Sequence, residues 1–271
     1  MKLKLWQVDA FANQPLGGNP AAVIPLDAWI DDGRMQKIAR ENNLSETAFS
    51  VRTAPGRYEL RWFTPEAEIE LAGHPTLATA WTIFEIISPG LDAVTFTTRF
   101  SGELTVSRNP DRTVTMSLPA SPSQPFDGPA DIKERIGAAL GVEPPKEVLK
   151  SRYLTAVWDD PKSIRSIRDC GDIARVLRSI GFWGLVVTSK GDEGYDFISR
   201  FFAPDRGVPE DPVTGSAHTI LTPYWAKRLS KKTMRARQVS PRGGDLTCTD
   251  EGSRVAISGP CALYLEGEIR V

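Results

Sequence analysis

The stretch Arg61-Trp-Phe-Thr-Pro-Glu-Ala-Glu-Ile-Glu-Leu-Ala-Gly-His74 returns in altered form as Arg200-Phe-Phe-Ala-Pro-Asp-Arg-Gly-Val-Pro-Glu-Asp-Pro-Val-Thr-Gly-Ser-Ala-His218. Each copy has a strand-like start, a proline turn, acidic residues and a turn with glycine and histidine, and leads into an apolar helix that contains a tryptophan. The copies start 139 residues apart, about half of the 271-residue chain. Because these features recur in one order, the sequence predicts a duplicated domain.

Short segments of alternating polarity dominate the chain and predict β-strands with one buried face. They lie at residues 3–11, 47–51, 58–63, 102–106, 114–118, 148–157, 185–188, 195–202, 254–258 and 263–271. Amphipathic helices are predicted at residues 33–43, 132–140 and 172–180. Strands come in runs with helices interspersed, which indicates an α+β fold and not a doubly wound parallel sheet.

Two further helices follow the repeated stretches, at residues 75–87 and 216–229. The first carries a single charge, Glu85, so it should be buried nearly all round. In the second, Pro223 is expected to kink or interrupt the hydrogen-bond ladder. Residues 119–129 contain four prolines and are the best candidate for a linker. Their central position favours two halves of similar size.

The composition excludes several classes of protein. With 41% hydrophobic and 25% charged residues, the chain is neither disordered nor fibrous. Its net charge of −1 argues against a nucleic-acid partner, and no apolar run approaches the roughly 18–20 residues of a membrane helix. Three scattered cysteines favour a reduced, cytoplasmic compartment, and two histidines argue against a zinc site of the usual kind. We therefore expect a globular protein that acts on a small molecule.

Both histidines, His74 and His218, lie at the starts of the helices that follow the repeated stretches. Each helix begins after a turn that contains glycine, so backbone N–H groups and the positive end of the helix dipole face that turn. Such a position suits a carboxylate, and two of them related by a pseudo-two-fold axis can hold a small acid from both sides. The alternative is a structural histidine, which is favoured for His218 because it lies further into its helix.

A second candidate group is Asn42-Asn43-Leu44-Ser45-Glu46-Thr47-Ala48-Phe49. A helix is expected to end at the asparagines and a strand to begin near Thr47, so Glu46 lies at the mouth of an element. A partly desolvated carboxylate in that position can serve as a general acid and base. The alternative is a solvated glutamate in a turn.

The third group, residues 210–218, holds the residue types of a hydrolase triad. However, Ser216 and His218 are two residues apart at a helix start and point in different directions. The chain also lacks a Gly-x-Ser-x-Gly elbow. Asp211 is therefore interpreted as a carboxylate for substrate binding or proton handling, with helix capping as the alternative.

Two glycine-containing turns are further candidates for contact with a ligand. Gly17-Gly18-Asn19-Pro20 predicts a turn at which backbone can approach a ligand closely, and Pro241-Arg242-Gly243-Gly244 predicts a hairpin with Arg242 as a candidate anion contact. Neither a P-loop nor Gly-x-Gly-x-x-Gly occurs, so no nucleotide cofactor is indicated. The roles of Gln238, Arg242 and His218 stay open at this level.

Taken together, these segments resemble the PhzF-like family, the isomerases of phenazine biosynthesis within the diaminopimelate-epimerase-like superfamily. The matching segments are residues 8–11 with 18–23, residues 44–49, residues 72–78 and residues 211–218. They occur in the order of the family, and the chain has its length.

The resemblance implies an α+β fold of two similar halves, each a curved, mostly antiparallel or mixed sheet wrapped around a central buried helix, with the active site in the cleft between them. The N-terminal half is then residues 1–118 plus 263–271, with its helix at 75–87. The C-terminal half is residues 119–262, with its helix at 216–229. The resemblance also implies a homodimer that uses neither a cofactor nor a metal ion.

The resemblance further implies roles for single residues. Glu46 matches the acid/base glutamate of the family, while His74 and Asp211 are expected to orient the substrate and stabilise developing charge. The expected substrate-binding residues are Asn19, Gly73, Thr214, Gly215 and Ser216, the two glycines through their backbone amides.

One departure separates the chain from the epimerase branch, which uses a cysteine at each of the two helix starts. Here these places carry Ala72 and Asp211-Pro212, so a two-thiol mechanism is not available. We expect an isomerase that moves a proton on a small carboxylated metabolite, a cyclic amino or hydroxy acid resembling dihydro-hydroxyanthranilate, by glutamate acid/base catalysis. The alternatives are a non-catalytic module that binds a metabolite or partner protein and, less favoured, an amino-acid epimerase.

Overall fold

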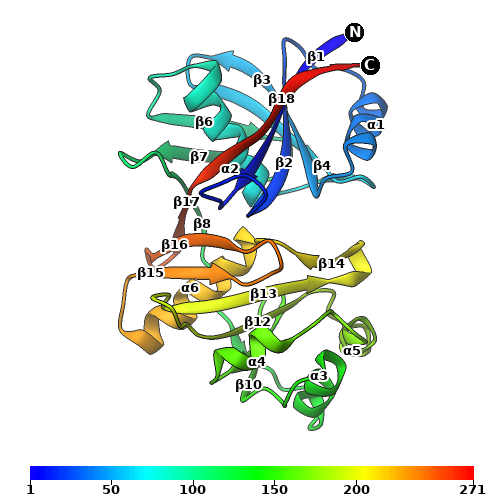
Figure 1. Ribbon diagram of the computed structural model, residues 1–271, viewed down its shortest axis with the longest axis vertical. Coiled ribbons are helices and arrows are strands. Elements are labelled where there is room, and N and C mark those ends of the chain that lie inside the picture. Colours follow the sequence, from blue (N-terminus) through cyan, green and yellow to red (C-terminus); the bar gives the residue numbers. More distant parts are fainter. The chain divides into compact units, whose positions relative to one another are not determined.

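The computed structural model describes residues 1–271 and shows two compact units. Unit 1 consists of Met1–Ser117 and Ala256–Val271, and unit 2 of Leu118–Val255. Each unit combines strands with a few helices (Figure 1). Unit 1 contains both chain ends, where the backbone N–H of Val271 donates to the carbonyl of Met1 over 2.9 Å.

Unit 1 is built on a mixed sheet. Its strands are β1 (Lys2–Ala10), β2 (Asn19–Leu26), β3 (Glu46–Ala54), β4 (Arg57–Phe63), β5 (Glu68–Ile69), β6 (Ala93–Thr98), β7 (Glu103–Arg108), β8 (Val114–Pro119), which leads out of the unit, and β18 (Cys261–Arg270). Its helical segments are α1 (Asp32–Asn42), α2 (Gly73–Thr82) and the π-helical turn η1 (Ile83–Ile87), which continues α2.

Unit 2 has strands of similar number and more helices. Its strands are β9 (Gln124–Pro125), β10 (Glu147–Lys150), β11 (Leu154–Trp158), β12 (Leu185–Lys190), β13 (Phe197–Ala203), β14 (Val208–Asp211), β15 (Thr233–Gln238) and β16 (Gly244–Asp250). The strand β17 (Arg254–Gly259) begins in unit 2 and continues into unit 1 from Ala256. Its helical segments are α3 (Ile132–Leu140), α4 (Pro161–Ser166), α5 (Ile173–Ser179), the 3₁₀ turn η2 (Pro204–Arg206) and α6 (Gly215–Leu229).

The two units repeat one order of strand neighbours. In unit 1, β2 is antiparallel to β1 and parallel to β3, and β4 is antiparallel to β3 and β5 but parallel to β6. In unit 2, β11 is antiparallel to β10 and parallel to β12, and β13 is antiparallel to β12 and β14 but parallel to β15. The helices α2 and α6 follow β5 and β14. A mixed sheet with few helices confirms the α+β class, and its repeated order is what a duplication produces.

Each unit is completed by a strand that follows the other repeat in the sequence. β9 comes after the last strand of the first repeat and pairs antiparallel with β10. β18 comes after the second repeat and pairs antiparallel with β1, so that red β18 lies beside blue β1 in Figure 1. Unit 1 is therefore assembled from the two ends of the chain.

An arginine–glutamate pair recurs at one place in both repeats. Arg61 on β4 donates from Nε and Nη2 to the two carboxylate oxygens of Glu68 over 2.7 and 2.8 Å, and Arg200 on β13 binds Glu210 over the same two distances. Each glutamate stands five residues before the first residue of the central helix. These two pairs, called the clamps below, fix the short strand that leads into each helix, because a bidentate contact defines both distance and direction.

Two helices cover opposite faces of the sheet in unit 1. Ala21 packs with Ala78 of α2, whereas Ile24 and Phe49 pack with Met35 of α1. Successive residues of a strand point to opposite faces, so the face of a residue follows from its position. The first residue of β3, three positions before Phe49, therefore points toward α2.

Unit 2 divides its faces in the same way. The aliphatic side chains of α3, α4 and α5 pack with Ile198 and Phe202 of β13 in one cluster. The alternate residue Phe197 stacks on Trp225 of α6, with ring centroids 6.0 Å apart and planes 8° apart. The helix α6 thus occupies the sheet face that α2 occupies in unit 1.

Some predicted elements are corrected by the structure. The single strand expected over residues 148–157 is a hairpin of β10 and β11, which pair antiparallel. The helix expected to begin at Pro75 begins at Gly73. The last strand begins at Cys261, and unit 1 resumes at Ala256 rather than at Leu263.

The expected interruption of the hydrogen-bond ladder at Pro223 is confined to one bond, and α6 does not end there. The helix continues from Gly215 to Leu229 through this residue. A proline leaves the carbonyl four residues earlier without its helical donor. That carbonyl, of Thr219, accepts a hydrogen bond from the backbone N–H of Ser121 over 3.1 Å instead. A segment from the predicted linker therefore replaces the missing helical bond.

Candidate active site

Glu46 and His74 lie together in unit 1. Glu46 is the first residue of β3, and His74 is the second residue of α2. Glu46 Oε2 is 3.0 Å from His74 Nε2, and the two side chains are 16% and 7% exposed. Both atoms are shielded from solvent, and their approach lies off the usual direction of a hydrogen bond. The sequence nominated the two residues from separate motifs, and the fold brings them into contact.

Asn19 extends this group from the start of β2. The hydroxyl of Ser45 donates to Asn19 Oδ1 over 3.3 Å, and Asn19 is fully buried. The preceding residue, Gly18, has a φ of +58°, and a Cβ there would lie 2.1 Å from the carbonyl oxygen of Ala10. Only glycine fits a turn of this kind so close to β1. The predicted turn at residues 17–20 therefore places Asn19 beside the residue that precedes Glu46.

The start of α2 has no side-chain cap. Its N-cap residue, Ala72, offers no polar side chain, and the carbonyl of Ala72 accepts a hydrogen bond from the hydroxyl of Thr76 over 2.6 Å. Pro75, at the third helical position, has no N–H group to satisfy. The backbone N–H of Gly73 therefore stands at the positive end of the helix dipole, which suits an anion.

In unit 2, Gln238 holds the turn that precedes α6. Its Nε2 donates to the carbonyl of Asp211 over 2.6 Å, and its Oε1 accepts from the backbone N–H of Thr214 over 2.9 Å. The hydroxyl of Thr214 donates to the carboxylate of Asp211. The sequence left Gln238 open, because only the pairing of β13 with β15 brings this last residue of β15 to the turn.

Ser216, the second residue of α6, contacts a tyrosine that the sequence analysis did not single out. Its Oγ is 2.9 Å from the hydroxyl of Tyr153, the residue before β11. No side chain caps the start of α6, so the backbone N–H of Gly215 stands where that of Gly73 stands in unit 1. No local pattern marks Tyr153, since a tyrosine at the edge of a buried strand is common in cores.

His218 is a core residue and not a second His74. Its Nδ1 is 2.8 Å from the carbonyl of Thr214 one turn earlier, the same contact that the hydroxyl of Thr76 makes in unit 1. Burial lowers the pKa of His218 to about 4, so the ring is neutral at pH 7. A carbonyl can only accept, so Nδ1 carries the proton. The structural alternative is thus the correct one for His218.

The strand registers align the two repeats residue by residue. The clamp arginines lie opposite Phe49 in β3 and Val187 in β12. Glu46, three residues before Phe49, therefore corresponds to Gly184, three residues before Val187. The position that has a carboxylate in unit 1 has no side chain in unit 2.

The helix starts differ in the same manner. Counting from the clamp glutamates, Gly73 corresponds to Gly215 and His74 to Ser216. Where unit 1 has a carboxylate against an imidazole, unit 2 has a phenol against a serine hydroxyl. The nominated residues thus form two groups of different chemistry, one in each unit.

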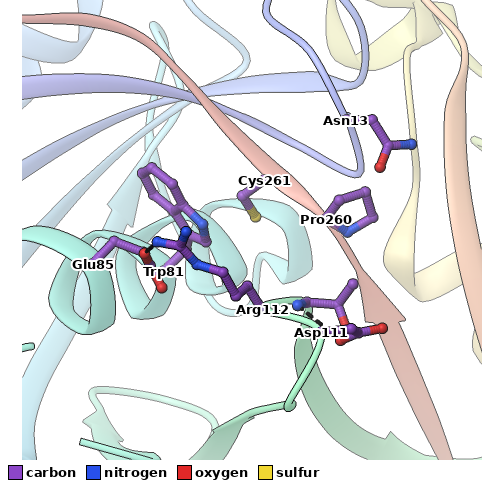
Figure 2. A pocket seen from close by; sticks show the side chains of 8 residues that line it. Asn13, Trp81, Glu85, Asp111, Arg112, Pro260 and Cys261 are labelled. Atoms are coloured by element: carbon purple, nitrogen blue, oxygen red, sulfur yellow. Dashed lines mark hydrogen bonds and ion pairs between the residues drawn. The ribbon is translucent and has the colours of Figure 1, made fainter. Parts of the chain in front are cut away.

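A cavity of about 310 Å³ in unit 1 contains none of the nominated residues (Figure 2). It is lined by Asn13, Trp81, Glu85, Asp111, Arg112, Thr113, Pro260 and Cys261. Trp81 and Glu85 belong to the last turns of the central helix, away from the start that holds His74. The carboxylate of Glu85 is already paired with Arg108 and Arg112, and that of Asp111 accepts from Thr113.

A second cavity, of about 440 Å³, lies over strands of the same unit. It is lined by Leu5, Gln7, Ala22, Asn42, Leu44 and residues 265–269. None of the nominated residues lines it. None of the helices combines the length and the apolar composition that a membrane span requires. No three His, Cys, Asp or Glu side chains lie close enough together to hold a metal ion.

The duplicated fold is that of epimerase-like proteins. A hydroxyproline epimerase from Agrobacterium vitis has it with a TM-score of 0.59, at 10% identity over 99% of this chain and 92% of that chain, a likeness of fold alone. The family model of phenazine biosynthesis-like proteins, PhzC-PhzF, matches residues 8–267. The chain belongs to this family.

Two relatives are similar along the whole chain. An uncharacterized isomerase of Pseudomonas aeruginosa is 48% identical over 271 residues, which are 100% of both chains. The crystal structure of a PhzF family protein from Enterococcus faecalis has a TM-score of 0.92 and 41% identity, and covers 100% of both chains. The family named in the sequence analysis is therefore confirmed.

Proposed function

We propose that the protein is a cofactor-independent isomerase that moves a proton on a small carboxylated metabolite, with Glu46 as general acid and base. The contact between Glu46 and His74 at the uncapped start of α2 carries this proposal. Membership of the phenazine biosynthesis-like family and the isomerase name of a relative support the reaction class. The proposed substrates are cyclic amino or hydroxy acids resembling dihydro-hydroxyanthranilate.

The proposed step needs one carboxylate. Glu46 takes a proton from one carbon of the substrate and returns it to another, so the product is an isomer and no other reactant is consumed. His74, 3.0 Å away, orients the carboxylate and offers its ring nitrogen to developing charge. Catalytic contacts that are poorly aligned without substrate often tighten when it binds.

The difference between the repeats favours isomerisation over epimerisation. An epimerase removes a proton on one face of the substrate and returns it on the other, and so needs two groups. The position that corresponds to Glu46 is Gly184, which has no side chain. The thiols of Cys248 and Cys261 are not available either, because desolvation raises the pKa of each to about 12. Glu46 therefore has no proton-handling counterpart in unit 2.

The helix starts supply the proposed carboxylate binding. The backbone amides of Gly73 and Gly215 lie at uncapped helix starts, where an anion is favoured by N–H groups and by the dipole. Ser216 adds a hydroxyl at the second position of α6. Asp211, held by Thr214 and Gln238, is proposed to orient an amino or hydroxyl group of the substrate.

The proposal is tested by deuterium uptake from heavy water into a panel of cyclic dihydro amino and hydroxy acids. We expect the parent protein to place deuterium on a ring carbon of at least one compound. Glu46→Gln should lower the rate of labelling about 10²–10⁴-fold, the usual contribution of a general acid–base group. Glu41→Gln, an exposed residue at the end of α1, serves as the matched control and should keep the full rate.

Retention of more than about a tenth of the labelling rate by Glu46→Gln would contradict the role of Glu46 as general acid and base. Saturable binding with no label at carbon would favour a non-catalytic module on this fold. We also propose the homodimer that the family resemblance implies. The chain has a mass of 29.8 kDa, and light scattering of the purified protein should give twice that mass.

A further inference from the structure

We propose that Tyr153 is a positioning residue that directs the hydroxyl of Ser216 toward the carboxylate of the ligand. The inference rests on the proposed function, because it assigns a partner to a residue of the carboxylate-binding group proposed at the start of α6. The bond between Tyr153 and Ser216, 2.9 Å between oxygens, is the observation from which it starts.

The tyrosine is held rigidly. Tyr153 is 3% exposed, and its ring meets Trp183 edge-on with centroids 5.0 Å apart and Phe201 with centroids 4.8 Å apart. Edge-to-face contacts of this length are favourable and define the orientation of a ring. The phenol oxygen therefore has one position, which is at Ser216.

The aromatic cluster exists because Gly184 has no side chain. A Cβ at Gly184 would lie 2.9 Å from the ring of Phe201 and 3.0 Å from the ring of Tyr153. In unit 1 the corresponding residue is Glu46, and the register of β2 with β3 gives Ala21 as the counterpart of Tyr153. The second repeat thus has an aromatic ring and a phenol in place of the carboxylate of the first.

The order of donors follows from the chemistry of the two hydroxyls. A hydroxyl has one proton to donate and two lone pairs to accept. If the phenol, the more acidic group, donates to Ser216 Oγ, then the proton of Ser216 is left to be donated elsewhere. A carboxylate can only accept, so a ligand carboxylate at the start of α6 enforces this order. Hydrogen bonds in such a chain polarise and strengthen one another.

Two guanidinium groups lie on rings of the aromatic cluster. The guanidinium of Arg152 lies over the ring of Tyr153 at 5.6 Å from its centroid, and that of Arg206 lies over Trp183 at 5.1 Å. A cation on the face of a phenol draws electron density from the ring and makes its O–H a better donor.

A double-mutant cycle tests the proposal with calorimetric binding of 3-hydroxyanthranilate, the aromatic counterpart of the proposed substrates, and of its uncharged amide. Tyr153→Phe keeps the ring and removes only the hydroxyl. We expect it to weaken binding of the carboxylate about tenfold and binding of the amide less than about twofold, since a bond to a charged group is worth more. In a Ser216→Ala background, Tyr153→Phe should cause no further loss. Tyr264→Phe, at an exposed tyrosine, is the control and should change neither affinity.

Losses that add in the double variant, equal losses for the acid and the amide, or no saturable binding of the acid to the parent protein would each overturn the role of Tyr153. The same cycle on the Glu46→Gln background separates this inference from the proposed function. Coupled losses there, together with undiminished deuterium labelling by Glu46→Gln, would leave Tyr153 in place and remove only the acid–base role.

Discussion

The starts of α2 and α6 share a scaffold and differ in chemistry. Both follow a clamp of one arginine and one glutamate with the same bond lengths, and both begin with an uncapped glycine. In both, a side chain at the fourth helical position bonds the carbonyl one turn back, from Thr76 in α2 and from His218 in α6. The reactive positions differ: Glu46 and His74 in unit 1 have the counterparts Gly184 and Ser216 in unit 2.

This difference teaches which parts of a duplicated domain are bound by the fold. The clamp and the bond one turn back position the helix, so both repeats retain them. The residue at the start of β3 or just before β12, and the second residue of each helix, are not needed to position the helix. They can therefore become a proton-transfer pair in one repeat and a hydroxyl network in the other without any change of topology.

Loss of a clamp arginine is expected to have the largest effect on the free energy of unfolding. Arg200 is 4% exposed, pairs with Glu210, and also donates to the carbonyls of Ile164 and Ile167, so Arg200→Met should leave several buried acceptors without a donor. We expect a loss of about 3–5 kcal/mol in the free energy of unfolding. Arg61→Met in unit 1 should cost only about 1–2 kcal/mol, because Arg99 also pairs with Glu68. Urea denaturation measures both.

If the two clamp variants lose equal stability, the clamps are equivalent and the extra partners of Arg200 contribute nothing. That result would contradict the expected difference between the two clamps. The exposed pair of Arg57 and Glu103 gives a baseline, since Arg57→Met should change the free energy of unfolding by less than about 1 kcal/mol.

His218 is expected to make the free energy of unfolding depend on pH. Its pKa is about 4 in the folded protein and 6.5 as an ordinary value, so between these pH values the unfolded chain binds a proton that the folded protein does not. The stability that this histidine contributes is therefore present above pH 6.5 and is lost as the pH falls toward 4, by on the order of 3 kcal/mol. His218→Thr, which imitates Thr76, should lack this part of the slope.

The measurement is urea denaturation of parent and variant at pH 7, 5.5 and 4.5. The variant should be less stable at pH 7, because a smaller side chain leaves a cavity. The gap between the two proteins should narrow as the pH falls. Parallel curves would show that His218 does not stay neutral in the folded protein.

The smallest expected effect is at Gly184. Gly184→Ala places a methyl group against two aromatic rings and should destabilise the protein by about 1–3 kcal/mol through overpacking. It should also weaken binding of 3-hydroxyanthranilate, since the ring of Tyr153 has to move. Gly267→Ala in β18 is the matched control, because its nearest atom is 3.9 Å from the added methyl, and it should be neutral or slightly stabilising. Equal stability of the two variants would contradict the crowding of the cluster.

Local patterns were sufficient for some of these features and insufficient for others. The echo of Arg61 and Arg200 predicted a duplication, and the structure shows it as two clamps with the same bond lengths. The apolar helix that carries Glu85 was predicted over residues 75–87, but its change to π-helical turns at Ile83 was not. The interruption at Pro223 was predicted from the missing donor alone, and the donor that Ser121 supplies lies about a hundred residues away in the sequence.

The candidate site divides in the same manner. The sequence nominated Glu46 and His74 separately and placed His74 and His218 in matching positions. The clamps show that His74 matches Ser216 instead. Tyr153 was not nominated and the role of Gln238 stayed open, because neither lies in a motif and each reaches the start of α6 only through the pairing of strands.

The order of residues along the chain by itself determined the duplication, the α+β class, the family, and the residue types at each helix start. These follow from periodicity and from short segments whose physical meaning is local. The tertiary structure alone decided which groups meet: the side chain of Glu46 with that of His74, the side chain of Ser216 with that of Tyr153, and the side chain of Gln238 with the backbone carbonyl of Asp211. Such contacts join residues far apart in the sequence, and the register of strands that sets them depends on the packing of the whole unit.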